Sequence, residues 1–130
     1  MCPPLPGLGG RRPALEAELV LSRPDSVLLH RADLNRCHEF PGLIEQVRAF
    51  RGRFDVLVNN ASGFYQTPFD DTGEEQREDL MGSNLKGPCF LTKAAAPLLR
   101  AASGCVVNLV DIHAERSLKG YPIYSIANGG

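Results

Sequence analysis

The sequence lacks any long uninterrupted hydrophobic run. No apolar stretch approaches the roughly 20 residues that a helix needs to cross a bilayer, and no charged segment leads into an apolar core, as in a secretory signal. A large excess of one charge is also missing, because 14 basic residues balance 15 acidic ones to a formal net charge of −1. We therefore expect a cytoplasmic protein that does not bind nucleic acid or a membrane through bulk charge.

Cysteines are few, and their spacing matches no metal or disulfide motif. Cys2, Cys37, Cys89 and Cys105 include no C-x-x-C pair and lie in unrelated contexts. We expect free thiols in a reducing compartment, with neither a zinc site nor a disulfide framework.

A complete glycine-rich nucleotide loop is missing as well. Gly7-Leu8-Gly9 begins like G-x-G-x-x-G, but Arg12 stands where the third glycine should be, and no strand precedes the motif. We therefore predict an irregular leader rich in proline and glycine over residues 1–13, and a single domain over residues 14–130.

The rest of the chain alternates between helical and strand patterns. Residues 40–50 have apolar side chains at a helical spacing, whereas residues 54–60 are a short β-branched run that ends in polar and small residues. Such alternation predicts an α/β fold with a parallel sheet. The expected elements are a helix end at 14–22, strands at 26–30, 54–60 and 104–110, and helices at 40–50 and 72–100.

Asp111 and Tyr124 are the first candidates for chemistry. The valine-rich run 105–110 predicts a strand buried on both faces, which places Asp111 at its carboxyl end, where open α/β sheets bind ligands. Tyr124 follows after a loop, at the start of an apparent helix. An acid beside a phenol can deliver a proton. The structural alternative is an aspartate that caps a turn and a tyrosine that packs its ring.

The long helix carries a third candidate, Asn84. Thr72 and Glu75 form a T-x-x-E pattern that predicts a capping box at the helix start. Pro88 has no N–H, so the carbonyl of Asn84 should lose its helical partner. Either the helix is simply kinked to fit its sheet, or Asn84 presents its free carbonyl and its amide to a site.

Taken together, these motifs resemble the short-chain dehydrogenase/reductase family. Residues 55–61 are similar to its N-N-A-G element, Thr72 to Asn84 to its long helix ending in a catalytic asparagine, and Gly104 to Asp111 to its fifth strand. Tyr124 is similar to the tyrosine of its Y-x-x-x-K motif. The aspartate at 111, where most of the family has serine, and the Ala61–Tyr65 stretch resemble the pteridine reductase branch.

The resemblance implies NADPH-dependent reduction of a C=N bond in a pterin or dihydrofolate, with homo-oligomeric full-length relatives. It implies catalytic roles for Asp111, Tyr124 and Asn84, and a flat face on Phe64 to hold a pterin. The implied cofactor contacts are Asp33, Leu34, Asn60, Ala61 and Ser62, and Ser62 could also contact the substrate. The structural alternative for these polar residues is satisfaction of local backbone at strand ends. His113 is interpreted as a solvated loop histidine.

The sequence also departs from the family. Asn128 occupies the position of the Y-x-x-x-K lysine, and no T-G-x-x-x-G-x-G phosphate loop is present. The expected fold is therefore an incomplete Rossmann-like doubly wound parallel sheet with the family's third, fourth and fifth strands, marginal in stability, whose chain does not measurably bind NADPH. In it, residues 26–30 should pair directly with 54–58 or leave the sheet. A non-catalytic remnant or interaction module, and a generic keto-reductase, remain alternatives.

Overall fold

The computed structural model describes residues 17–21, 23 and 25–130, and divides into two compact units, residues 1–31 and 32–130. The predicted leader over 1–13 lies outside the described residues. Residues 17–21 are helical, within the helix end predicted for 14–22. Among the described residues, no helix has both the length and the apolar character needed to span a bilayer. The sites discussed below all lie in the second unit.

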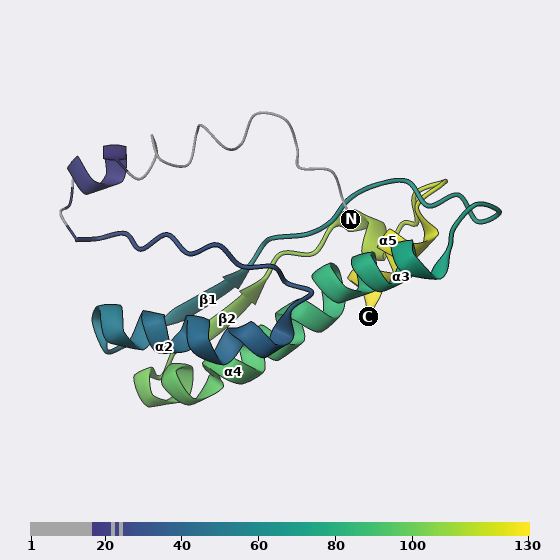
Figure 1. The fold of residues 1–130 in the computed structure, drawn as a ribbon. Helices are drawn as coiled ribbons and strands as arrows, with labels where there is room; N and C mark the ends of the chain where they lie inside the picture. The colour runs from purple at the N-terminus through teal and green to yellow at the C-terminus, as the bar shows by residue number, and fades with distance from the viewer. Residues whose placement is uncertain (1–16, 22, 24) are drawn as a thin grey trace. The chain divides into compact units, whose positions relative to one another are not determined.

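The second unit contains a sheet of two parallel strands, β1 (Val56–Asn59) and β2 (Cys105–Asn108). Val56 pairs with Cys105 at the start of the strands and Asn59 with Asn108 at their carboxyl ends (Figure 1). The predicted α/β class, the parallel direction and the adjacency of these two strands are confirmed. The two asparagines therefore stand side by side at the edge where a ligand site was expected.

The strand predicted at residues 26–30 is wrong. These residues have no regular structure, and the sheet consists of β1 and β2 within the described chain, so they do not pair with 54–58. Leu28 and Leu29 are exposed. A β-branched and apolar run forms a stable strand only where neighbouring strands complete its hydrogen bonds.

Helices and connecting loops make up the rest of the second unit. The predicted helix at 40–50 is confirmed, and the long helix at 72–100 is present with a turn of different geometry inside it. The elements are η1 (Cys37–Glu39), α2 (Phe40–Arg51), α3 (Glu74–Met81), the π-helical turn η2 (Gly82–Lys86), α4 (Gly87–Ala102), η3 (Ile112–Ala114) and α5 (Pro122–Gly129).

Helical cover lies on one face of the sheet. In Figure 1, α2 and α4 lie over this face. Leu57 of β1 packs with Ile44 of α2 and with Ala95 and Leu99 of α4, and Val106 of β2 lies against the same cluster. On the opposite face Val56, Val58 and Val107 are 46%, 53% and 44% exposed. The prediction that the second strand is buried on both faces is therefore wrong here, because the described chain supplies helices to one face only.

The long helix does not begin with the predicted capping box. Gly73 is the N-cap residue, and its N–H donates to the side-chain oxygen of Gln76 at 2.8 Å. Thr72 instead donates its hydroxyl to the carbonyl of Pro68 at 2.7 Å. Only half of a capping box is therefore present, shifted by one residue, because Gly73 has no side chain to accept from the helix and the turn before the helix already uses the Thr72 hydroxyl.

The predicted break at Pro88 takes the form of a π-helical turn. Over Gly82–Lys86 the helix is wider, and the N–H of Gly87 donates to the carbonyl of Gly82, five residues back. A wider turn accommodates a proline, since the missing N–H and the ring would otherwise disturb a regular α-helical turn. Asn84 lies at the middle of this turn and faces the loop after β1.

Candidate functional site

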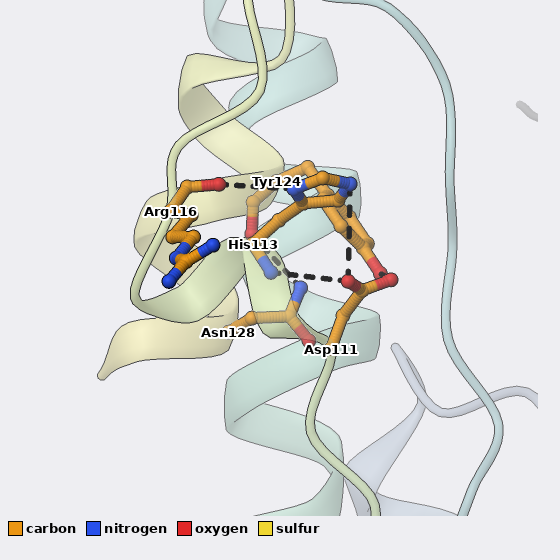
Figure 2. Close-up of polar contacts among 5 residues, drawn as sticks. All are labelled: Asp111, His113, Arg116, Tyr124 and Asn128. Atoms are coloured by element: carbon orange, nitrogen blue, oxygen red, sulfur yellow. Dashed lines mark hydrogen bonds and ion pairs between the residues drawn. The ribbon is translucent and has the colours of Figure 1, made fainter.

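Asp111 and Tyr124 are brought together at the carboxyl end of the sheet. Asp111 follows β2 and caps η3 by accepting a hydrogen bond from the backbone N–H of His113 at 3.0 Å. Its other oxygen accepts from the hydroxyl of Tyr124, a buried residue of α5, at 2.9 Å. Figure 2 shows both contacts converging on the one carboxylate. The pairing expected from the sequence is present, and the turn-capping alternative holds at the same time.

The surroundings of Asp111 and Tyr124 move the pKa values of the two groups in opposite directions. The backbone N–H of His113, and then the Tyr124 hydroxyl, lower the pKa of Asp111 below its ordinary value. Burial, followed by the Asp111 carboxylate, raises the pKa of Tyr124 above 10.0. Asp111 is therefore ionised and Tyr124 holds the proton near neutral pH. Proton delivery by Asp111 needs either its desolvation or a phenol neighbour, and the structure supplies the phenol neighbour, Tyr124.

This coupling predicts how the phenol titrates. In the Asp111→Asn variant the carboxylate no longer opposes the phenolate, so Tyr124 should ionise at lower pH than in the parent chain. Phenolate absorbance against pH measures this, with the Tyr124→Phe curve subtracted to remove the other tyrosines. Because folding raises the pKa of Tyr124, the stability it contributes is present below about pH 10 and lost as pH rises through the folded pKa. Coincident phenolate curves would show that Asp111 does not act on Tyr124.

Phe64 lies beside this pair in an aromatic group with Tyr121 and Tyr124. Its ring is stacked on Tyr121 with centroids 4.7 Å apart, and it meets Tyr124 edge to face, also at 4.7 Å. Phe64 is nevertheless 53% exposed. A large exposed ring held by two others is a suitable surface for a flat ligand next to the phenol.

Asn84 holds the loop that carries Phe64. Its side-chain oxygen accepts from the backbone N–H of Gly63 at 2.7 Å, and its amide nitrogen donates to the carbonyl of the same residue at 2.9 Å. The hydroxyl of Ser83 donates to the same side-chain oxygen at 2.9 Å. The amide of Asn84 is therefore a positioning group for residues 63–64 in this structure.

A cavity of about 320 Å³ opens at the carboxyl ends of the strands. Three of the predicted site residues line it, namely Ala61, Ser62 and Asn84. Its floor includes Asn59 of β1, whose amide donates to the side chain of Asn108 at 2.7 Å and to Thr92 of α4 at 3.2 Å. The strand ends thus supply a small hollow with a mixed polar and apolar lining. The lining includes Val110, the residue before Asp111, but neither Asp111 nor Tyr124.

Three predicted cofactor contacts lie outside this cavity lining. Asp33 accepts from the backbone N–H of Asn35 at 2.9 Å within its own turn. Leu34 packs against Gly87, where an added Cβ would come within 2.7 Å of the Leu34 carbonyl. Asn60 is exposed beside β1. For Asp33 the local contact is the structural alternative considered from the sequence, and the cofactor roles of all three stay predictions.

Asn128, at the family's lysine position, also lines the cavity. Its amide donates to the backbone carbonyl of Tyr124 at 2.9 Å and only weakly opposes the rise in the pKa of that residue. Sequence reasoning missed Asn59, Asn108 and Tyr121. The first two could have been found, since each predicted strand has an asparagine close to its carboxyl end and parallel strands bring such ends together.

Comparisons with known proteins agree with this geometry. Residues 11–130 match the family model described as Enoyl-(Acyl carrier protein) reductase. The chain is 34% identical, over 87% of its length, to pteridine reductase 1 of Leishmania tarentolae, covering 52% of that protein. It is 36% identical, over 82% of its length, to a putative ketoacyl reductase of granaticin polyketide synthase from Streptomyces violaceoruber, covering 44% of it.

A solved structure gives the same picture. A short-chain dehydrogenase from Streptomyces avermitilis superimposes with a TM-score of 0.80 at 32% identity, over 92% of this chain and 44% of that one. The chain thus spans about half the length of the relatives it matches. With the family model covering nearly all of it, the chain belongs to the short-chain dehydrogenase/reductase family of oxidoreductases.

Proposed function

We propose that this chain forms the catalytic part of an NADPH-dependent reductase of C=N bonds in pterins or dihydrofolates. The observation that carries the proposal is the 2.9 Å hydrogen bond from the Tyr124 hydroxyl to Asp111, beside the exposed ring of Phe64. The similarity to a pteridine reductase supports the substrate class. The aspartate at the end of β2, where most of the family has serine, supports it as well.

The residues divide the work between binding and proton transfer. Phe64 offers a flat surface for the pterin ring, and the amide of Asn84 holds the loop that presents it. When bound, NADPH supplies the hydride. The ring nitrogen that gains charge needs a proton, and Tyr124 is the group that holds one at neutral pH. Asp111 accepts from the Tyr124 hydroxyl and fixes its direction.

The cavity fits one part of the cofactor. At about 320 Å³ it is at the small end of the range for ligand sites, enough for one ring system with its sugar. Ser62, Asn108 and Asn128 give it donors and acceptors suited to an amide and to ribose hydroxyls. Its lining, drawn from the described residues, carries no lysine or arginine for phosphates. We therefore assign it to the nicotinamide side, with Asp33, Leu34 and Asn60 as proposed contacts further along.

Pterin binding should depend on Phe64. Because the chain spans about half of its relatives, activity is measured in a grafted reductase, in which residues 32–130 replace the matching segment of the Leishmania tarentolae enzyme. Phe64→Ala in that protein should weaken pterin binding by about 1–3 kcal/mol through lost stacking and burial. The KM for a dihydropterin measures the effect, and Phe69→Ala is the matched control, since Phe69 is 85% exposed and forms no ring stack with Phe64.

Two alternative functions predict different activities for the grafted reductase. A ketoacyl reductase, suggested by the Streptomyces violaceoruber relative, would reduce a keto-substrate faster than a pterin and would ignore Phe64→Ala. A non-catalytic remnant would leave the grafted reductase inactive on both substrates. Dihydropterin turnover that falls on Asp111→Ser while keto-substrate turnover rises would support the pterin assignment.

A further inference from the structure

Tyr124 needs a source of protons, and the lysine of the Y-x-x-x-K motif is replaced by Asn128 in this chain. After each turnover the phenolate must regain the proton it gave away. In the family the position of Asn128 holds a lysine, whose ammonium can carry a proton, whereas the Asn128 amide cannot. In this chain that amide is bonded to the backbone carbonyl of Tyr124. The proton therefore does not come from the side chain at position 128.

The ring of His113 is held in place against Asp111. Its Nδ1 lies 2.9 Å from the carbonyl oxygen of Arg116, and since a carbonyl can only accept, Nδ1 carries the hydrogen. That fixes the other nitrogen, Nε2, towards Asp111, 3.9 Å from Oδ1 (Figure 2). Asp111 in turn accepts from Tyr124 through Oδ2. The three side chains form one row with the carboxylate in the middle.

The row reaches solvent at His113 and at Asp111, whereas Tyr124 is buried. Tyr124 is 3% exposed, whereas the side chains of His113 and Asp111 are 26% and 37% exposed. A histidine is the side chain best able to exchange protons with water near neutral pH. Arg116 contacts the ring of His113 through its backbone carbonyl oxygen and not through its guanidinium. The charged group that lies near Nε2 of His113 is the carboxylate of Asp111, at 3.9 Å.

Resting on the proposed function, we propose that His113 is the residue that returns protons to Tyr124, through Asp111. Tyr124 gives its hydroxyl proton to the substrate nitrogen and becomes a phenolate beside a carboxylate. The imidazolium of His113 passes its Nε2 proton to Asp111 Oδ1 through a bridging water, since the 3.9 Å gap is too long for direct transfer. The carboxyl group then turns to donate that proton to the phenolate. Asp111 is again a carboxylate, Tyr124 a phenol and His113 a neutral imidazole, which takes its next proton from water.

The first test uses the chain itself and requires no turnover. Exchange of the Tyr124 hydroxyl proton with water is measured by NMR in the parent chain and in His113→Gln. Glutamine can still donate to the Arg116 carbonyl, and the backbone N–H at 113 still caps Asp111, but an amide does not take up and release a proton near neutral pH. Exchange should slow by about 10²-fold, the lower end of what a positioned acid–base group contributes. In His113→Ala, added imidazole should restore it in proportion to its concentration.

His38→Gln is the matched control, because His38 is 73% exposed and lies beside Glu39. It should leave exchange unchanged, with or without imidazole. Equal exchange rates in the parent chain and His113→Gln would overturn the relay, whatever the enzyme does. Slowed exchange in a protein whose grafted reductase reduces no pterin would keep the relay and refute the proposed function. In an active grafted reductase, His113→Gln should lower kcat and leave KM unchanged.

Discussion

Asn128→Lys in the grafted reductase is expected to raise the rate of dihydropterin reduction by about 10²–10⁴-fold, the range of a positioned acid–base group. An ammonium near the phenol favours the phenolate, so the pKa of Tyr124 should fall from its raised value and its proton should transfer more readily. The same charge could grip the nicotinamide ribose, for which the cavity beside Asn128 has room. Steady-state kcat measures the first effect, and the phenolate titration measures the pKa.

Asn128→Gln is the control for this change, because it lengthens the side chain without adding a charge. It should not raise the rate. An unchanged kcat in Asn128→Lys would mean that the family's lysine role does not transfer to this position. A raised kcat in both variants would mean that loss of the Asn128 hydrogen bond to the Tyr124 carbonyl, and not the charge, causes the effect.

A double variant with Asn128→Lys and His113→Gln tests whether His113 takes the role of the missing lysine. If His113 replaces the missing lysine, His113→Gln should reduce kcat strongly in the parent grafted reductase and only slightly once Asn128→Lys is present. His113 lies near the Asp111 carboxylate, whereas Asn128 contacts the backbone carbonyl of Tyr124. Additive effects of the two substitutions on kcat would therefore mean that the two residues act independently.

Elements whose own sequence determines their packing could be predicted. The helix at Phe40–Arg51 has its apolar side chains at helical spacing, and Phe40 and Ile44 are indeed buried. The two strands were found from short β-branched runs bounded by turn residues. The segment 26–30 is also a short apolar run, but it has no regular structure, and Leu28 and Leu29 are exposed. Composition alone does not report whether a neighbouring strand is available.

The candidate site, like the fold, could be predicted from the sequence only in part. Spacing from a strand end was enough to bring Asp111 and Tyr124 together, since a strand's carboxyl end and the following helix must meet there. Which of the two holds the proton could not be predicted, because it depends on the backbone N–H of His113 and on the burial of Tyr124. The role of the Asn84 amide was also hidden, since its partner is the backbone of Gly63, which has no side-chain signal in the sequence.

Gly104→Ala is expected to destabilise the chain by about 3 kcal/mol, the upper end of the range for overpacking. Gly104 lies where α4 turns into β2, and its N–H donates to the Leu99 carbonyl at 2.7 Å. A Cβ at this position would lie 2.3 Å from the carbonyl oxygen of Asp55. That oxygen also accepts from the N–H of Cys105 at 2.9 Å, so relief of the clash opens the first rung of the sheet.

The same substitution at Gly42 is the matched control, and it should act in the opposite direction. Gly42 lies inside α2, and an added Cβ would have nothing within 4 Å, so alanine gains helix propensity at no steric cost. Gly42→Ala should stabilise the chain by up to about 1 kcal/mol. Denaturant unfolding of the two variants and the parent measures both changes. Equal stability of Gly104→Ala and the parent would mean that β2 does not start against Asp55, and the register of the sheet would then be wrong.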